Sequence, residues 1–537
     1  MYCHTSQVNQ LTALLLAHEI YHIVVCPGSR NATIVHNLHE YGAPFELHPV
    51  TDERSAGFVA LGLSLALQSP TAVCVTSGSA LLGCIPAAAE AFYRHIPLLV
   101  ISADRPMQWI GQYDGQTLAQ NGALRPYCST FQLCVPHNDQ DLWYNNRSIN
   151  EALLSLQQAD GGPAHINVPI EEPMFEFTVP ELPQERIIHQ ITPTYQKPLP
   201  ATLIEDIQAA RLPAIIIGQY DKGDIRAEID ALNRESQLLI LPEILSDVQG
   251  SFRMNILDTA DANDTELIPD LILHIGGNFI HKRFKQLLRH HDCRVIRIGQ
   301  DAQMPDTFCH LDTYISVPVR SVLLQLVDEL SPRHTGVIKA QTRYDEAIRH
   351  KAIQKESKGL TQHHTLSRLY DLLCSQGLTY TLHLANSRTV RVAGQIFPSG
   401  EQQIYGNRGT NGIEGSLSTA VGYALGMWGL SITIIGDLSF FYDANALWNT
   451  QLPNNLRILL LNNGHGSIFD HLPGLSESPA RDKLIAAGKQ DFSAEGLATT
   501  FHSGYYRADK VSELDDLLKQ WLQPANQAQI LEVFTED

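Results

Sequence analysis

The chain contains 537 residues with a formal net charge of -19, and 44% of its residues are hydrophobic while 18% are charged. This length exceeds what one hydrophobic core supports and predicts roughly three or four domains. The acidic balance argues against nucleic acid or an anionic membrane as the main partner, because both are polyanions. A small anionic ligand remains compatible with local groups of basic residues.

The cysteines and the amino-terminal residues indicate the compartment. The nine cysteines form no CxxC pair, so we expect neither a disulfide framework nor a zinc site built on cysteine. The first ten residues lack the charged and then apolar layout of a signal peptide. No apolar run approaches the roughly 20 residues that span a bilayer. We therefore expect a cytoplasmic protein without a membrane span.

Short apolar runs alternate with helical patterns from the amino terminus to about residue 179. Residues 21–26, 71–75 and 97–101 are such runs, and each ends in a loop that contains Gly, Ser or Asp. Buried parallel strands in β-α-β units have this pattern, with ligand-binding loops at their carboxyl ends. Residues 45–50 also predict a strand, which places Glu53 where that strand gives way to a buried helix.

Two further α/β series follow a proline-rich stretch at 179–200, which predicts a linker. The charged residues 335–358 predict a solvated helix that connects the second series to the third. The apolar runs of the two series are 214–218, 238–242, 271–276 and 295–299, and then 431–437 and 457–463. We predict an α/β protein of three tandem, doubly wound parallel-sheet domains, at 1–180, 198–332 and 358–537, without an evident sequence repeat between them.

The third series carries a pattern typical of a metal site. One predicted strand ends at Gly436-Asp437, and the next ends about 26 residues later at Asn462-Asn463. A carboxylate and an amide oxygen at neighbouring strand ends are hard ligands that suit Mg²⁺, and nearby glycines let backbone amides approach a diphosphate. Neither a Walker loop nor a strand-linked G-x-G-x-x-G motif is present, so ordinary nucleotide signatures do not explain the pattern.

These two strand ends resemble the metal motif of thiamine-diphosphate enzymes, which is a Gly-Asp-Gly-like element followed by Asn-Asn. In that family the amino-terminal domain supplies a glutamate to the aminopyrimidine ring of the cofactor, and Glu53 matches it. The resemblance implies that Glu53 promotes the cofactor's tautomerisation, and that burial raises its pKa toward the range for proton sharing. It also implies a homodimer, or a homotetramer, with active sites at subunit interfaces.

Further motifs resemble one subfamily along the whole chain, the menaquinone-pathway 2-succinyl-5-enolpyruvyl-6-hydroxy-3-cyclohexene-1-carboxylate synthases. These motifs are CPGSR (26–30), TDER (51–54), TSGSA (76–80), SADRP (102–106), HKR (281–283), NS (386–387) with Arg391, NRGTNGIEG (407–415) and GDLS (436–439). The resemblance implies a transferase that decarboxylates 2-oxoglutarate and adds the succinyl group in conjugate fashion to isochorismate. It implies thiamine diphosphate and Mg²⁺ or Mn²⁺ as cofactors.

The resemblance also assigns site residues. Cofactor contacts are implied for Glu53, Gly436, Asp437, Leu438, Ser439, Asn463, Ile413, Ile468 and Phe469. Asp437, Asn463 and the main-chain oxygen of His465 are the implied metal ligands. Arg391 and Arg408 are implied to hold the succinyl carboxylate, and the isochorismate side is implied to consist of Ser29, Arg30, Arg105, Gln116, Lys282 and Ser387. Guanidinium forks suit substrates that together carry four carboxylates.

Two positions depart from the subfamily pattern, and two other functions remain open. His465 stands where glycine is usual, and Asp114 stands two residues before Gln116 where the family often carries asparagine ahead of the glutamine. A different thiamine-diphosphate carboligase, such as an acetolactate-forming type, is one alternative, although small neutral substrates need few arginines. A catalytically inactive homologue that serves as a binding subunit is the other, although Glu53, Asp437 and Asn463 are all present.

Overall fold

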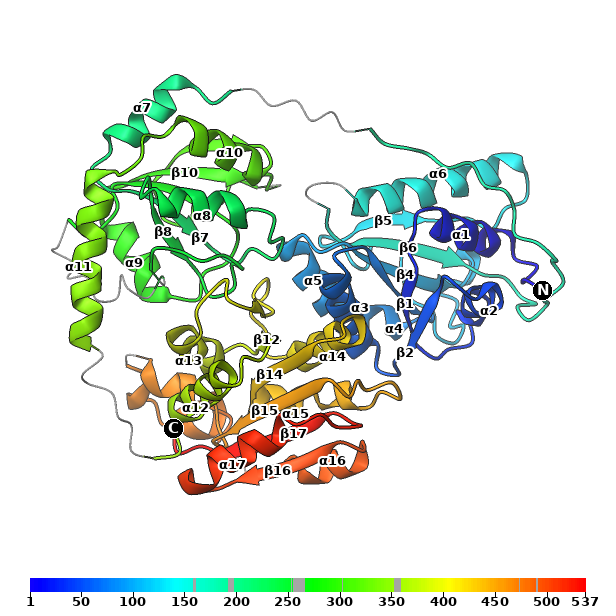
Figure 1. The fold of residues 1–537 in the computed structure, drawn as a ribbon. Coiled ribbons are helices and arrows are strands. Elements are labelled where there is room, and N and C mark those ends of the chain that lie inside the picture. Colours follow the sequence, from blue (N-terminus) through cyan, green and yellow to red (C-terminus); the bar gives the residue numbers. More distant parts are fainter. Residues whose placement is uncertain are drawn as a thin grey trace.

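The computed structural model describes residues 1–157, 161–191, 198–252, 254, 266–301, 303–351, 359–472, 474–488 and 491–537. Three parallel sheets follow one another along the chain and form three lobes (Figure 1). Separate clusters of buried apolar residues lie on the two faces of the sheets, as expected where helices cover both faces. The predicted α/β class with three parallel sheets is confirmed.

The first lobe is built on a six-stranded sheet of order β2-β1-β3-β4-β6-β5. Its strands are β1 (His22–Val25), β2 (Glu46–Pro49), β3 (Thr71–Val75), β4 (Leu98–Asp104), β5 (Ser129–Gln132) and β6 (Ala164–Pro169). Its helices are α1 (Ser6–Ala17), α2 (Ala32–Tyr41), α3 (Glu53–Leu67), α4 (Ser79–Gly83), α5 (Ile85–Arg94) and α6 (Asp139–Leu156), with a 3₁₀ turn at Met107–Trp109. Glu53 is the first residue of α3, directly after β2, as the sequence predicted.

The central lobe is built on a five-stranded sheet of order β11-β10-β9-β7-β8. Its strands are β7 (Pro213–Ile217), β8 (Leu239–Pro242), β9 (Leu271–Ile275), β10 (Arg294–Gly299) and β11 (Leu311–Ser316). Its helices are α7 (Ala201–Ala209), α8 (Arg226–Arg234), α9 (Lys282–His290), α10 (Val319–Glu329) and α11 (Thr335–Lys351).

Helix α11 corrects one expectation. The charged stretch 335–358 was expected to be a solvated connection, yet Val337, Ala340 and Tyr344 of α11 are buried in the core of the central lobe. These residues recur at helical spacing, so one face of α11 is apolar although the helix is charged overall. Residues 352–358 of the predicted connection, and residues 192–197 of the predicted linker, lie outside the described residues.

The third lobe is built on a six-stranded sheet of order β13-β12-β14-β15-β17-β16. Its strands are β12 (Tyr380–Leu384), β13 (Gln403–Tyr405), β14 (Leu430–Gly436), β15 (Leu456–Asn462), β16 (Gly504–Ala508) and β17 (Gln529–Phe534). Its helices are α12 (Gln362–Ser375), α13 (Arg388–Ile396), α14 (Ser416–Gly426), α15 (Asp437–Tyr442), α16 (Glu495–Thr500) and α17 (Val511–Trp521). Short 3₁₀ or π turns lie at Ala444–Leu447, Ser467–His471, Leu475–Glu477 and Arg481–Ile485. The exact domain boundaries stay predictions.

The first and third lobes share one topology. Numbered within each lobe, both sheets have the strand order 2-1-3-4-6-5. The first two crossovers leave the first strand in opposite directions, so each sheet has a topological switch point between its first and third strands. A ligand site is expected at the carboxyl edge of each sheet beside that point. No repeat in the amino-acid sequence signals this shared topology.

The equivalent helices α3 and α14 join the two lobes. A Cβ atom at Gly62 of α3 would lie 2.0 Å from the carbonyl oxygen of Thr419, and one at Gly422 of α14 would lie 2.0 Å from that of Val59. Only glycine permits such close approach of two helix backbones. Figure 1 shows α3 and α14 side by side where the first and third lobes meet. The contact fixes the two carboxyl sheet edges relative to each other.

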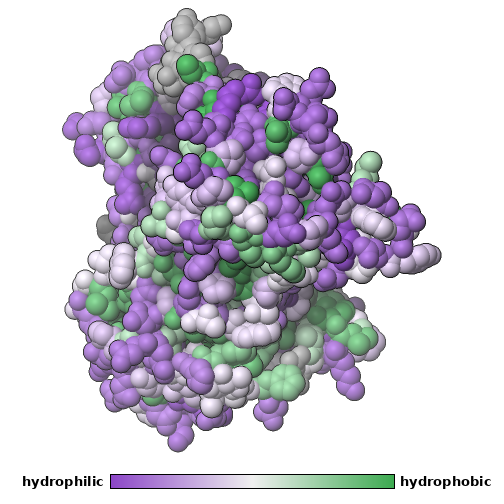
Figure 2. Space-filling view, turned by 90° about the vertical axis from the view of Figure 1, so that its right-hand side faces the viewer, coloured by the Kyte–Doolittle hydropathy of each residue, from purple (hydrophilic) through white to green (hydrophobic). Residues whose placement is uncertain are grey.

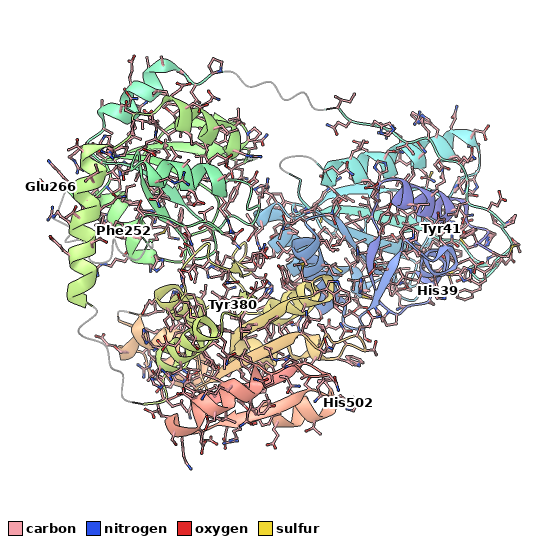
Figure 3. All side chains as sticks on the ribbon, in the orientation of Figure 1. His39, Tyr41, Phe252, Glu266, Tyr380 and His502 are labelled. Carbon is pink, nitrogen blue, oxygen red and sulfur yellow. The ribbon has the colours of Figure 1, made fainter. Side chains whose placement is uncertain are left out.

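The surface is mixed in character. Figure 2, which views the molecule from the side of the first lobe, shows hydrophobic side chains gathered across the middle and lower part of that face. In the stick view the outer end of the first lobe is marked by His39 and Tyr41, and an outer part of the third lobe by His502 (Figure 3). No helix among the described residues has both the length and the apolar character needed to cross a bilayer.

Candidate active site

Asp437 and Asn463 lie at the carboxyl ends of the paired strands β14 and β15. The ladder aligns Gly436 with Leu461, so the residues that follow each strand are neighbours. The Asp437 side chain is buried, and the backbone N–H groups of Leu438 and Gly464 donate hydrogen bonds to it. Burial nevertheless raises the pKa of its carboxyl to about 6, because these hydrogen bonds do not make up for the lost solvation of the charged form.

The loop after β15 accommodates His465 without strain. Gly464 adopts the left-handed φ of 72° that favours glycine, whereas His465 has no positive φ. The His465 ring places Nε2 2.8 Å from Asp470 Oδ2 and Nδ1 3.1 Å from the Asn463 carbonyl oxygen. A histidine therefore fits at this position with an ordinary backbone, and both ring nitrogens have partners within the loop.

The remaining predicted cofactor residues surround this cluster. Ser439 Oγ donates a 2.5 Å hydrogen bond to the Ile413 carbonyl oxygen, which ties the loop before α14 to the start of α15. Leu438, Ile468 and Phe469 are half-buried, and Ile413 is exposed. Half-exposed apolar groups beside a buried carboxylate suit a ligand with one polar and one apolar part.

Two predicted arginines lie at the same sheet edge. Arg391 is on α13, which follows β12, and Arg408 is in the loop after β13. Arg391 on α13 donates a hydrogen bond to the Ser387 carbonyl oxygen, and Arg408 donates one of 2.9 Å to Asn386 Oδ1. Burial lowers the pKa of Arg391, and burial together with the neighbouring Arg391 lowers the pKa of Arg408 to about 10. Neither guanidinium pairs with a carboxylate within 4 Å among the residues that the structure describes, and Nε of Arg408 is buried there without a hydrogen-bond partner.

The backbone at Ser387 supports a functional reading of this region. Ser387 precedes α13 with a φ of 74°, which is costly for a residue other than glycine. Asn386 holds the same loop in place, because its Nδ2 donates to the carbonyl oxygens of Asn407 and Gly412 at 2.7 and 2.6 Å. Strained backbone held by buried hydrogen bonds is typical of ligand sites.

The central lobe places a further basic residue near Arg391 and Arg408. Lys285 on α9 is half-buried, and its pKa is lowered by burial and by the positive charges of Arg289, Arg408 and Arg391. The predicted Lys282 lies one turn earlier and is exposed. Lys285 was not predicted as a site residue, although its place three residues after Lys282 on one helix was a usable signal.

Glu243 of the central lobe offsets part of the positive charge of Arg391 and Arg408. It is fully buried after β8, and its Oε2 accepts a 2.9 Å hydrogen bond from the Ile280 N–H. Burial opposes its ionisation, but hydrogen bonds from His281 and from the backbone lower its pKa below the usual value. His281 Nδ1 lies 3.4 Å from Glu243. The carboxylate therefore stays charged behind the two arginines.

Glu53 lies at the carboxyl edge of the first sheet, close to the third lobe. Its neighbours contact that lobe directly: Asp52 Oδ2 accepts from Asn445 Nδ2 at 2.9 Å, and Arg54 donates to the Tyr442 carbonyl oxygen at 2.9 Å. The Glu53 side chain is half-buried rather than buried, and its carboxylate has no hydrogen bond or ion pair with the described residues. The expected enclosure of Glu53 is not complete within one chain.

Of the other predicted residues of the first lobe, Arg30 and Arg105 both lie beside Glu172. Arg30, after β1, is buried and donates to the Ile170 carbonyl oxygen at 2.9 Å and to Glu172 at 3.1 Å. Arg105, after β4, lies 3.0 Å from Asp114 Oδ2 and 3.7 Å from Glu172. Ser29 and Gln116 are exposed, and Gln116 has a φ of 56°. The structure thus brings the arginines together, each already paired with a carboxylate.

A buried network of ion pairs and hydrogen bonds connects the three lobes next to the loop that carries Arg408. None of its residues was predicted from the sequence. The Glu90 carboxylate of α5 accepts hydrogen bonds from the N–H groups of Gly409 and Thr410, at 2.9 and 2.7 Å, and from Thr410 Oγ1 at 2.9 Å. Arg94, one turn later, pairs with Asp221 of the central lobe at 2.8 Å. Glu90 is fully buried, so the loop that carries Arg408 is held by a carboxylate of the first lobe.

Comparison with known proteins defines the class of enzyme and then the family. A family model described as the thiamine pyrophosphate enzyme, N-terminal TPP binding domain, matches residues 7–123, which include Glu53. A relative from Bacteroides thetaiotaomicron is 39% identical over 100% of this chain and 97% of its own, and one from Cytophaga hutchinsonii is 34% identical over 98% and 96%. A relative from Desulfotalea psychrophila is 33% identical over 98% of each chain.

The match over residues 7–123 places the chain among the thiamine-diphosphate enzymes. All three relatives carry the name 2-succinyl-5-enolpyruvyl-6-hydroxy-3-cyclohexene-1-carboxylate synthase. The chain belongs to the family of these synthases, and the similarity spans all three lobes.

Proposed function

We propose that this chain catalyses the synthesis named by its relatives, in which 2-oxoglutarate loses CO₂ and the remaining succinyl group adds to isochorismate. The observation that carries the proposal is that the half-buried guanidinium group of Arg391 and the buried one of Arg408, at the sheet edge that carries Asp437, have no carboxylate within 4 Å among the described residues. Glu243 offsets their charge only in part, and a dicarboxylate ligand would remove the remaining cost of burying two cations. Pyruvate, the substrate in acetolactate formation, has no distal carboxylate for such a pair to bind.

The residues at the ends of β14 and β15 fit thiamine diphosphate and a divalent cation. Asp437 and the Asn463 side chain offer hard oxygen ligands, and the main-chain oxygen of residue 465 would complete the protein's share. A divalent cation would also supply the positive charge that the buried Asp437 lacks. Mg²⁺ and Mn²⁺ are the cations of this type that we expect. When bound, thiamine diphosphate supplies the electron sink for loss of CO₂ from a 2-oxo acid.

The chain's own residues have distinct tasks in this proposal. Glu53 shares a proton with the aminopyrimidine of the cofactor, which requires that its carboxylate be covered. Arg391 and Arg408 bind and orient the distal carboxylate of 2-oxoglutarate through charge-assisted hydrogen bonds. Arg30 and Arg105 receive the carboxylates of isochorismate, and they exchange Glu172 and Asp114 for the substrate when it binds.

A second copy of the chain would supply the cover that Glu53 lacks. Met107, Trp109 and Tyr113 are large apolar side chains exposed on the loop between Arg105 and Gln116. Trp428, Tyr442 and Trp448 are exposed near the contact of the first and third lobes. Exposed apolar groups on this scale mark an interaction surface. We propose a homodimer, or a homotetramer, in which the first lobe of one chain completes the site of the other.

The direct test is incubation with both substrates, thiamine diphosphate and Mg²⁺, followed by mass spectrometry of the products. We expect one CO₂ and one adduct per turnover, and no adduct when isochorismate is omitted. Formation of acetolactate from pyruvate at a higher rate would favour the alternative carboligase. Retention of the cofactor without any turnover would favour a binding subunit.

A further inference from the structure

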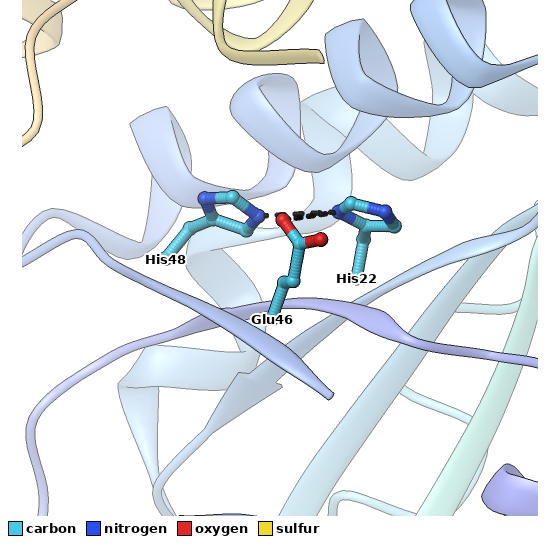
Figure 4. A group of neighbouring side chains, drawn as sticks. All are labelled: His22, Glu46 and His48. Atoms are coloured by element: carbon cyan, nitrogen blue, oxygen red, sulfur yellow. Dashed lines mark hydrogen bonds and ion pairs between the residues drawn. The ribbon is translucent and has the colours of Figure 1, made fainter. Parts of the chain in front are cut away.

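A group of three metal-binding side chains lies outside the candidate active site, on the edge of the first sheet. His22 begins β1, and Glu46 and His48 lie on the neighbouring edge strand β2 (Figure 4). The parallel ladder sets His22 opposite Glu46, and His48 lies two residues further along β2. Residues two apart on a strand project to the same face, so all three side chains meet above one patch of the sheet.

The distances match those around a tetrahedral metal ion. His22 Nδ1 lies 3.4 Å from His48 Nε2 and 3.7 Å from Glu46 Oε2, and the three donor atoms all lie within 4.8 Å of one another. Metal–ligand bonds of about 2.0–2.1 Å at tetrahedral angles place donor atoms roughly 3.4 Å apart. Among the described residues, this is the one group of three or more His, Cys, Asp or Glu side chains with such geometry.

The surroundings keep the group ready for a cation. His48 is buried beside His22, and a histidine binds a metal ion through its neutral imidazole. The two rings face each other nitrogen to nitrogen and lie nearly parallel, at 12°. His48 Nδ1 is buried without a hydrogen-bond partner among the described residues, whereas Nε2 points at His22 Nδ1.

We propose that His22, Glu46 and His48 form a binding site for a zinc-like transition-metal ion, separate from the Mg²⁺-type site at Asp437. Two imidazoles and one carboxylate select zinc, cobalt or nickel over magnesium, whereas carboxylate and amide oxygens select magnesium. Three protein ligands leave a fourth position for water. His22 and Glu46 lie at the amino ends of their strands, away from the edge that carries Glu53, so the ion ties the edge strand to the sheet and takes no part in catalysis.

The test uses the full chain saturated with Mg²⁺ and thiamine diphosphate, titrated with Zn²⁺ by calorimetry and with Co²⁺ by visible absorption. We expect one additional Zn²⁺ per chain and the intense absorption of tetrahedral Co²⁺. The melting temperature should rise with Zn²⁺, because an ion that binds only the folded state stabilises it. His22→Ala should weaken Zn²⁺ binding by more than roughly tenfold, since loss of an outer-shell partner alone has effects of about this size.

His39→Ala is the matched control, because His39 is exposed on α2 at the outer end of the same lobe (Figure 3). It should bind Zn²⁺ as the unaltered chain does. Glu46→Gln changes an exposed side chain and serves as the second variant if His22→Ala fails to fold. Absence of the additional Zn²⁺, a purely octahedral Co²⁺ spectrum, or equal binding by the variants would overturn the proposal. None of these readouts depends on the proposed catalytic function.

Discussion

The first and third lobes have the same strand order, yet they treat positive charge in opposite ways. In the first lobe, Arg30 and Arg105 pair with Glu172 and Asp114 at the carboxyl edge of the sheet. In the third lobe, Arg391 and Arg408 hydrogen-bond only to neutral oxygens there, and burial lowers their pKa values. One topology therefore supports both a site whose arginines are paired with carboxylates and one whose arginines are offset only in part, by Glu243.

The difference suggests a division of labour between the substrates. An anion that enters the third lobe gains the full attraction of two poorly solvated cations, so its carboxylate is held tightly. An anion that enters the first lobe must displace Glu172 or Asp114, so only the difference between the two pairings contributes. In the proposed function, the 2-oxo acid should therefore depend more on Arg391 and Arg408 than the second substrate depends on Arg30 and Arg105.

We expect the largest effect from Glu53→Gln, which tests whether the first lobe takes part in catalysis with the third. This change keeps the size of the side chain and removes its ability to share a proton. We expect turnover to fall by roughly 10²–10⁴-fold, the usual contribution of acid–base catalysis, with little change in the dissociation constant of thiamine diphosphate. Steady-state kinetics and calorimetric titration measure the two quantities.

Glu181→Gln is the control, because Glu181 is exposed on the segment that follows the first lobe. Unchanged turnover in Glu53→Gln would mean that the carboxyl edge of the first sheet does not take part in catalysis.

Arg408→Ala and Arg105→Ala test whether the arginines of the third and first lobes bind different substrates. Loss of a charge-assisted hydrogen bond costs about 1.5–3 kcal/mol, so Arg408→Ala should lower kcat/KM for 2-oxoglutarate by roughly 10–150-fold. Arg105→Ala should affect 2-oxoglutarate far less and act mainly on isochorismate. Initial rates with each substrate varied in turn separate the effects. Equal losses for both substrates in both variants would refute the division of labour.

The link between the lobes is tested by Glu90→Gln. The Glu90 carboxylate accepts three hydrogen bonds from the loop that carries Arg408, and an amide in its place turns an NH₂ group toward backbone N–H donors. We expect a loss of about 1–2 kcal/mol in the free energy of unfolding and a higher KM for 2-oxoglutarate. Denaturant titration and kinetics report the two effects. A loss of stability with no change in KM would leave Glu90 a purely structural role.

Local patterns predicted the elements of this fold better than its long-range contacts. The strand ends at 25, 436 and 462 were predicted to within one residue, and the helix start at Glu53 was predicted too, because apolar runs and the polar loops after them are adjacent in the sequence. The pairing of Glu90 with Thr410 joins positions 320 residues apart, and no local pattern signals it. The short strand Gln403–Tyr405 was missed, because three residues show no periodicity.

The candidate site shows the same limit. Lys282 was chosen from its motif, but helix α9 leaves it exposed and places Lys285 near Arg391 and Arg408. Packing decides which face of a helix points inward. The motif therefore predicted the right helix but not which of its lysines lies near the arginines. Arg30 and Arg105 were predicted to line the isochorismate side, and their contacts with Glu172 depend on a loop from a distant part of the chain.

The smallest expected effect separates these two lysines. Lys285→Ala should raise the KM for 2-oxoglutarate by roughly three- to fivefold, or about 0.5–1 kcal/mol, because the lysine acts beside the arginines rather than through a direct contact. Lys282→Ala should change it by less than about twofold. Burial and the neighbouring guanidinium groups lower the Lys285 pKa, so Lys285 loses its charge at a lower pH than an ordinary lysine does. Affinity for the dianion should therefore decline as pH rises through that pKa, and Lys285→Ala should keep only the decline that comes from Arg408, whose pKa is lowered to about 10. If Lys285→Ala has the same alkaline profile as the unaltered chain, the third lobe attracts its anion through the arginines alone.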